Sequence, residues 1–302
     1  MPSFIDPTVA LAGLFVGFVV GLTGMGGGAL MTPILVLLFK VQPLAAVSSD
    51  IVASLIMKPV GGGVHWRRGT VNMGLVRWLA LGSVPSAFVG VLLLKSSGQG
   101  EALQHHVKLS LGLALMVVAV GLIVRPLLVR GRKAGESLAP VVVKKLPTVL
   151  IGIAGGLVVG LTSVGSGSLM IILLLLLYPK LRLSELVGTD LVQAIPLVAS
   201  AALGHAFFGD FRLALTASIL IGSVPGVFIG AQLSSRAPDG LIRPALILVL
   251  LGSSLKLLNS STPLLALVIA AFGVAYLAVR FNEQRSARVA VGLAGNSPIP
   301  KG

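Results

Sequence analysis

The sequence predicts an all-α integral membrane protein built from two inverted-topology repeats, and three observations support this fold class. The first is composition: 55% of the 302 residues are hydrophobic, 11% are charged, and the mean hydropathy is +1.02. A soluble domain carries about 25% charged residues, so this chain has too few polar side chains to cover a surface in water. The second observation is a series of long apolar runs, and the third is an internal duplication.

The apolar runs predict transmembrane helices. Runs such as 105–129, 184–208 and 213–235 are long enough to cross about 30 Å of hydrocarbon as helices. A membrane β-barrel would instead show shorter segments that alternate with a period of two residues. The expected segments are 8–22, 28–40, 44–64, 72–94, 105–126, 147–162, 167–179, 184–208, 213–235, 241–258 and 262–281.

Two motifs show that the second half of the chain repeats the first. GLTGMGGGALM at 21–31 and GLTSVGSGSLM at 160–170 agree at 7 of 11 positions. GSVPSAFVG at 82–90 returns as GSVPGVFIG at 222–230. Shared low complexity would not reproduce this order of Gly, Pro and Phe, so the chain contains a duplication.

Single polar residues follow the same register. Asp50 corresponds to Asp190 and His65 to His205, at the offset that separates the two GSVP strings, whereas the offset between the glycine motifs is one position shorter. We therefore expect four parts. They are a first transmembrane repeat (1–130), a cytoplasmic linker (131–146), a second transmembrane repeat (147–281) and a flexible cytoplasmic tail (282–302).

The two repeats are expected to have opposite orientations in the membrane. Five apolar segments separate one glycine motif from its copy, and an odd number places the copies on opposite sides. With the N-terminus outside, the cytoplasmic loops carry most of the Lys and Arg, as the positive-inside rule requires. We expect a multi-pass protein of the cell inner membrane with a cytoplasmic C-terminus. Many secondary transporters that work by alternating access share this plan, although a duplicated structural protein is an alternative.

Glycines interrupt two short pairs of segments, 8–40 and 147–179. The individual segments have about 13 to 16 residues and reach about 20–24 Å, less than a bilayer core. We expect each pair to form two half-helices that meet at a break, either as a re-entrant hairpin or as two tilted crossings. The competing interpretation is a helix-packing surface, since Gly17 and Gly21 have the small-xxx-small spacing.

Each break presents the N-terminus of its second half-helix, where free N–H groups and the helix dipole favour an anion. Neighbouring hydroxyls add donors, and neither motif contains an acidic residue. We therefore predict a site for a small oxyanion near the membrane midplane. The predicted substrate-binding residues are Thr23, Gly24, Gly26, Gly27, Gly28, Thr162, Ser163, Gly165, Ser166, Gly167, Ser168 and Gln193.

Three ionisable residues inside apolar segments are predicted to serve the pathway or ion coupling. Asp50 and Asp190 lie near segment starts, where capping or bracing the neighbouring half-helix is the preferred role and proton transfer the alternative. Lys58 lies deeper, where an unpaired cation costs about 3 kcal/mol. It either attracts anions or extends its amine to the interface. His65 and His205, at segment ends, are expected to be interfacial.

These motifs resemble those of the sulfite exporter TauE/SafE family, also called the sulfite/sulfonate uptake permease family of membrane transporters. The resemblance covers most of residues 8–281 and includes SSDIVAS and GTDLVQA after the glycine motifs. It implies transport of small sulfur-containing anions such as sulfite, thiosulfate or organosulfonates. The second half has Gly188-Thr189-Asp190, the form associated with the family, whereas the first half has Ser48-Ser49-Asp50.

Other classes of function fit the sequence less well. The chain has no cysteine, which excludes thiolate metal sites, and we expect no cofactor and no metal. We also expect no nucleic-acid partner, because many of the basic residues behind the net charge of +14 lie in loops. The expected partners are a small anion, the lipid bilayer and, as candidate coupling ions, a proton or a cation. The sequence does not specify an oligomeric state. The remaining alternatives are a passive anion channel, a cation transporter and an intramembrane enzyme, although a GxSG protease motif would need glycine in place of Val164.

Overall fold

The computed structural model describes residues 4–23, 27–129, 142–233 and 239–261 and five isolated later positions, 263, 267–268 and 270–271. The chain divides into a unit of residues 1–258, which contains the membrane-length helices, and a unit of residues 259–302. Most of the expected linker, most of the segment 262–281 and the whole tail 282–302 lie outside the described residues.

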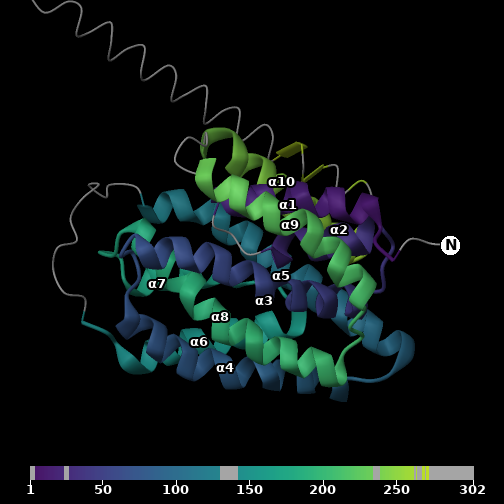
Figure 1. The fold of residues 1–302 in the computed structure, drawn as a ribbon, viewed down its shortest axis with the longest axis horizontal. Coiled ribbons are helices and arrows are strands. Elements are labelled where there is room, and N and C mark those ends of the chain that lie inside the picture. The colour runs from purple at the N-terminus through teal and green to yellow at the C-terminus, as the bar shows by residue number, and fades with distance from the viewer. Residues whose placement is uncertain are drawn as a thin grey trace, which may run out of the picture. The chain divides into compact units, whose positions relative to one another are not determined.

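Every regular element in the described residues is a helix, which confirms the all-α class (Figure 1). The helices coincide with the first ten expected segments to within a few residues at each end. They are α1 (Pro7–Thr23), α2 (Gly28–Leu37), α3 (Pro43–Arg67), α4 (Met73–Ser96), α5 (Gly100–Val129), α6 (Lys145–Thr162), α7 (Leu169–Leu177), α8 (Leu183–Phe208), α9 (Leu213–Leu233) and α10 (Asp239–Leu257).

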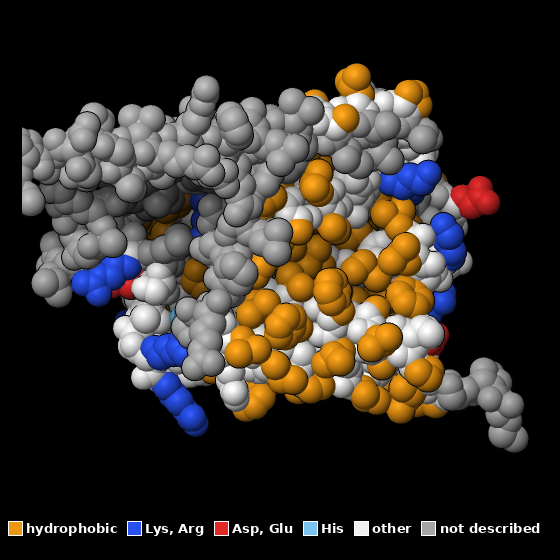
Figure 2. All heavy atoms as spheres, turned by 90° about the horizontal axis from the view of Figure 1, so that it is seen from above, with side chains coloured by type: hydrophobic (Ala, Val, Ile, Leu, Met, Phe, Trp, Pro, Cys, Tyr) orange, Lys and Arg blue, Asp and Glu red, His pale blue; other side chains and the backbone are white. Residues whose placement is uncertain are grey.

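Six helices in the described residues are long and apolar enough to cross a membrane, namely α3, α4, α5, α6, α8 and α9. By contrast, α2 and α7 have 10 and 9 residues, which is about 15 Å of helix or half a hydrocarbon core. In the visible part of the face drawn in Figure 2, apolar side chains gather in the middle and charged side chains lie towards its two ends. This distribution matches a lipid-facing surface.

The helices pack in a symmetric order. Neighbours in space follow the series α1, α9, α3, α8, α4, α6, with α1 and α9 near the top of Figure 1 and α4 and α6 at the bottom. Exchanging each helix for its copy in the other half, α1 for α6, α3 for α8 and α4 for α9, reverses the series but leaves every neighbour pair intact. The copies α5 and α10 also pack on each other. The two halves are therefore interlocked, with α1 of one half packed on α9 of the other.

The second interrupted pair, α6 and α7, returns to the end from which it started. The Tyr178 hydroxyl, just after α7, accepts a hydrogen bond from the backbone N–H of Lys144, just before α6, at 2.8 Å. It also lies 2.6 Å from the hydroxyl of Thr148 in the first turn of α6. Of the two arrangements that the sequence left open, these contacts favour the re-entrant hairpin.

The first interrupted pair shows the same relation at the opposite end of the helices. Before α1, the Asp6 backbone N–H donates to Ser218 near the start of α9 at 2.9 Å. After α2, Gln42 accepts a hydrogen bond at 3.2 Å from Arg212, also at the start of α9. We call this the Arg212 end, and the end that contains Lys144 and the C-terminus of α3 the Arg68 end. Hairpins that enter from opposite ends support the predicted inverted repeat.

Glycines spaced four residues apart join the interlocked helices. A Cβ added to Gly17 of α1 would overlap the backbone of Ser223 in α9, and a Cβ added to Gly156 of α6 would overlap the backbone of Ser83 in α4. Both partner serines belong to the repeated GSVPxxFxG strings, so these strings form the surface on which the glycines pack. The two seams, named here the α1–α9 seam and the α4–α6 seam, show that helix packing is the role of the glycines before each break.

Candidate functional site

The two breaks in the interrupted helix pairs lie against each other. A Cβ on Gly28, at the start of α2, would overlap the backbone carbonyl of Ser163 at the end of α6. The chain turns sharply there, because Ser163 adopts the left-handed conformation with φ of 62° and Gly165 and Gly167 have φ of 124° and 105°. These positive φ values explain why glycine recurs at this point. The two glycine motifs therefore meet in the structure, with their backbones in direct contact at Gly28 and Ser163.

Asp50 connects the two breaks. Its carboxylate is 1% exposed and accepts hydrogen bonds from the hydroxyls of Ser163 at 2.7 Å and Thr32 at 3.0 Å. Thr32 lies in α2 and Ser163 caps the C-terminus of α6, so one side chain of α3 holds both half-helices. This geometry matches the bracing role preferred for Asp50.

Asp190, the copy of Asp50, has a different environment. It is fully buried, and neither carboxylate oxygen makes a hydrogen bond of normal geometry to the described residues. Electrostatically it interacts with the backbone N–H of Gly167, in the second break, and with Lys58. A buried carboxylate with so little compensation is unusual in a folded protein.

Lys58 points into the protein rather than towards the end of α3. The side chain is 6% exposed, and its Nζ donates a hydrogen bond to the Ser166 hydroxyl in the second break at 2.9 Å. Its charge interacts with those of Asp190 and Asp50. Within the described part of the chain, the one ion pair with atoms within 4.0 Å joins Arg212 and Asp210, so Lys58 makes no close ion pair there.

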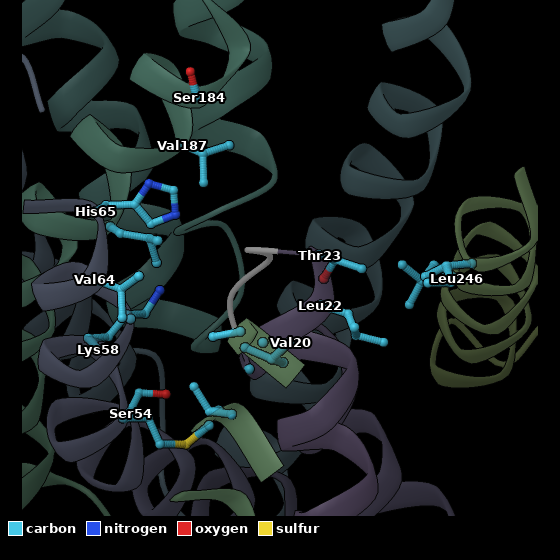
Figure 3. A pocket seen from close by; sticks show the side chains of 18 of the residues that line it. Val20, Leu22, Thr23, Ser54, Lys58, Val64, His65, Ser184, Val187 and Leu246 are labelled. Atoms are coloured by element: carbon cyan, nitrogen blue, oxygen red, sulfur yellow. The ribbon is translucent and has the colours of Figure 1, made fainter. Parts of the chain in front are cut away.

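A cavity of about 300 Å³ extends from Lys58 towards the Arg68 end, between α1, α3, α5, α8, α9 and α10 (Figure 3). Thr23 and Gly27 border it at the first break, and Ser54 and His65 lie on either side of Lys58 along α3. In Figure 3 Lys58 and His65 of α3 lie on one side of this space and Thr23 of α1 on the other.

The charged residues that line the cavity are all basic. They are Lys58, Arg68 and Arg125, joined by His65, and the described residues of the lining include no Asp or Glu. Sequence reasoning missed Arg125, although an arginine within the apolar run of α5 is the same signal that drew attention to Lys58. Walls that carry positive charge in a low-dielectric surrounding attract anions and repel cations.

The predicted site residues fall into three groups in the structure. Thr23, Gly27 and Lys58 line the cavity, and Ser166 touches Lys58. A second group lies in or beside the buried breaks, and Gln193 lies apart, donating its side-chain amide hydrogen to Ser83 on α4. The second group comprises Gly28, Asp50, Thr162, Ser163, Gly165, Gly167, Ser168 and Asp190. Gly24 and Gly26 lie outside the described residues. The described residues hold no cluster of three or more His, Asp or Glu that would bind a metal.

Membrane-length helices around two interrupted pairs, with a cavity beside the breaks that is lined by basic residues, define a polytopic membrane protein. The family model described as sulfite exporter TauE/SafE matches residues 9–257, and the chain belongs to this family of membrane transporters, which are not enzymes. The resemblance inferred from the motifs is confirmed.

Relatives in Bacillus subtilis (strain 168) agree with this assignment. The chain is 41% identical over 257 residues to the probable membrane transporter protein YjnA, covering 83% of this chain and 99% of the relative. It is 24% identical over 241 residues to the probable membrane transporter protein YdhB, covering 80% and 95% respectively. No solved structure matches the chain.

Proposed function

We propose that the chain is a secondary transporter that moves small sulfur-containing anions, such as sulfite, thiosulfate or an organosulfonate, by alternating access. Membership of the family provides the class of protein. The observation that carries the choice of an anion is the cavity at Lys58, where every charged residue of the described lining is basic. Sulfur oxyanions carry negative charge and accept several hydrogen bonds, which matches a lysine and hydroxyl groups.

The anion binds, in this proposal, where the cavity meets the first break. Lys58 supplies the positive charge, and the hydroxyls of Thr23 and Ser54 and the backbone at Gly27 border the same space. The volume lies at the lower limit of ligand sites, about 300–1,000 Å³, and suits a small solute. Asp50 and Asp190 are outside the cavity lining, which disfavours the alternative of a cation transporter that uses both carboxylates.

The Arg68 end faces the cytoplasm in this proposal, which places the N-terminus outside and the C-terminus inside. Positive residues gather there at the starts and ends of helices, as the positive-inside rule requires. They are Arg67, Arg68, Lys144, Lys145, Lys180 and Arg182. The cavity that reaches this end then represents an inward-facing state of the transporter.

A passive anion channel is the second candidate, because a cationic cavity also suits a pore. At the Arg212 end, however, His205 is fully buried and hydrogen bonded to the carbonyl of Gly160 at 2.8 Å. A path that reaches one end and is occluded at the other favours a carrier. Counterflow separates the two functions, since a carrier exchanges labelled for unlabelled substrate and a channel does not accumulate label in this way.

The experiment is uptake of radiolabelled sulfite, thiosulfate and a simple sulfonate into proteoliposomes loaded with the same unlabelled anion. Lys58→Met removes the charge and retains an unbranched side chain, and Lys256→Met on the exposed face of α10 is the matched control. A hydrogen bond to a charged group contributes about 1.5–3 kcal/mol, so Lys58→Met should raise the half-saturating concentration about 10- to 100-fold.

The remaining variants define the outcome. Lys58→Arg retains the charge and should recover part of the affinity, and Lys256→Met should behave as the parent protein. Equal affinity in the two methionine variants would contradict an anion site at Lys58. Absence of counterflow for all three anions in folded parent protein would overturn the proposed substrate class.

A further inference from the structure

The duplication allows the two ends of the molecule to be compared contact by contact. A counterpart is defined here by the alignment of the repeats, in which Gly21 pairs with Gly160 in α1 and α6, and Asp50 pairs with Asp190 in the helices after the breaks. The correspondence holds in three dimensions: the backbone N–H of Asn72 donates to the Thr189 hydroxyl at 3.0 Å. Its counterpart pair makes the same bond, from Arg212 N–H to the Ser49 hydroxyl, at 3.3 Å.

At the Arg212 end, α8 is closed against α4 and α6. The His205 ring nitrogen Nε2 lies 2.8 Å from the carbonyl oxygen of Gly160, and since a carbonyl accepts, Nε2 carries the hydrogen. A Cβ on Gly204 would lie 3.0 Å from the Cβ of Val91. The rings of Phe88 and Phe208 meet edge to face with centroids 6.1 Å apart.

At the Arg68 end, the counterparts of these residues border the cavity instead. The counterparts of His205 and Gly160 are His65 and Gly21, and both line the cavity. Val64 and Ala231, the counterparts of Gly204 and Val91, line it as well. Arg68, the counterpart of Phe208, is a further lining residue. The cavity is therefore bounded by residues whose copies are in contact at the other end.

The chemistry of the open end suits the same closure. The Nδ1 of His65 is held by the Thr70 hydroxyl at 3.0 Å, as the Nδ1 of His205 is held by the Ser48 hydroxyl at 2.9 Å. In each ring the Nε2 is then left for a second partner, which for His205 is the carbonyl of Gly160. Gly21 lies in the last turn of α1, as Gly160 does in α6, where backbone carbonyls have no partner in their own helix.

We propose, as an extension of the proposed transport function, that His65 and Val64 form a second gate with Gly21 and Ala231. We call this second gate the Arg68-end gate, and the existing contacts of His205 with Gly160 and of Gly204 with Val91 the Arg212-end gate. The Arg68-end gate closes by making the equivalent contacts, and the Arg212-end gate opens at the same time. The two glycine seams identify the moving parts, because α1 stays packed on α9 and α6 on α4 through backbone contacts. These two helix pairs swing against α3 and α8, which carry the histidines.

Disulfide trapping tests the proposal, and the absence of native cysteine makes every introduced thiol specific. Val64→Cys with Ala231→Cys reports closure of the Arg68-end gate. Val91→Cys with Gly204→Cys reports the closed Arg212-end gate, because the two Cβ atoms would lie 3.0 Å apart there and a separation of about half an ångström brings them into the 3.5–4.5 Å range of a disulfide. A protease site inserted within residues 131–141 lets a non-reducing gel show whether a disulfide still joins the two halves.

Both pairs should cross-link, because the carrier visits both states. Each cross-link should abolish sulfite counterflow, and a reductant should restore it, which also shows that the variants are folded. Failure of the 64–231 pair to cross-link with or without sulfite, while the 91–204 pair does so, would overturn the second gate. Counterflow that persists with the 91–204 disulfide intact would show that transport does not require the Arg212-end gate to open, and would overturn that part of the proposal.

The gate proposal and the proposed function fail in different ways. If neither parent protein nor reduced variants transport any sulfur anion but both disulfides form, the gates stand and the substrate class falls. If counterflow is normal but the 64–231 pair stays reduced, the substrate class stands and the gate falls.

Discussion

The two halves of this protein share their packing surfaces but differ in the residues around the cavity. The α1–α9 seam and the α4–α6 seam use glycine at matching positions, Gly17 and Gly156, against matching serines. Lys58, in contrast, has Val198 as its counterpart, and Val198 is buried in the apolar interior. The glycines and serines retained in both copies therefore maintain the packing of the scaffold, whereas the charge of Lys58 is present in one copy and borders the cavity.

The paired aspartates extend the comparison. Asp50 and Asp190 occupy equivalent positions, but Asp50 accepts hydrogen bonds from Ser163 and Thr32, and the oxygens of Asp190 accept none of normal geometry from the described residues. The counterpart of Thr32 is Ile171, which lacks a hydroxyl. One aspartate therefore braces the two breaks, while its copy leaves a buried charge that interacts with Lys58.

The largest expected effect comes from disrupting a seam. Gly156→Leu forces a side chain into the backbone of Ser83, and Gly17→Leu does the same at Ser223. Because the clash is with backbone atoms, which cannot move aside, each variant should lower the unfolding free energy by about 3 kcal/mol or more. Gly63→Leu is the matched control, because a Cβ there meets nothing within 4 Å.

Thermal unfolding in detergent, followed by size-exclusion profile, measures all three variants. The two seam variants should lose monodisperse protein to the same extent, and Gly63→Leu should resemble the parent. A marked difference between Gly156→Leu and Gly17→Leu would break the equivalence of the two seams.

A smaller effect should separate the two aspartates. Asp50→Asn weakens hydrogen bonds from Ser163 and Thr32 to a charged acceptor, which should lower the unfolding free energy by about 1.5–3 kcal/mol. Asp190→Asn removes a buried charge with no hydrogen bond of normal geometry, but it also removes a counter-charge of Lys58, so the unfolding free energy should fall by less than in Asp50→Asn. Thermal unfolding of both variants at one pH decides the matter, and an Asp190→Asn variant as unstable as Asp50→Asn would contradict the assignment.

The smallest effect is expected at the start of the interrupted pairs. Asp6 caps α1, because its carboxylate accepts hydrogen bonds from the Thr8 hydroxyl and the Thr8 backbone N–H, whereas Lys144 caps α6 without a side-chain bond. These bonds from Thr8 lower the pKa of Asp6 below its ordinary value of 3.8. A lowered pKa stabilises the folded state above the unfolded pKa and loses that contribution as pH falls through the folded value.

Asp6→Asn should therefore lower the melting temperature slightly at neutral pH, and the difference from the parent should shrink at about pH 3. Melting curves of both proteins at the two pH values measure this. A difference that grows as the solution becomes acidic would show that Asp6 does not act through its charge.

The membrane class, the ten described helices and the duplication could all be predicted from the sequence. Hydrophobic length alone defines spans such as α8 and α9, because the bilayer core has a fixed thickness. The motifs also indicated the family, and the short segments predicted half-helices such as α2 and α7. The glycines had two competing interpretations, and both apply, since those before the breaks pack helices and Gly165 and Gly167 permit the turn.

Burial and the grouping of charges could not be predicted in this way, because they depend on contacts between residues that are distant in the sequence. The expectation that His205 is interfacial was wrong, because Gly160, Ser48 and the neighbouring helices bury it completely. Arg125 and Arg68 join Lys58 around one cavity although they lie on different helices or beyond a helix end. Periodicity and hydropathy report on a residue's own helix, whereas burial and charge compensation depend on helices that are far away in the chain. For that reason the kind of molecule follows from the sequence, and the placement of its charges follows from the fold.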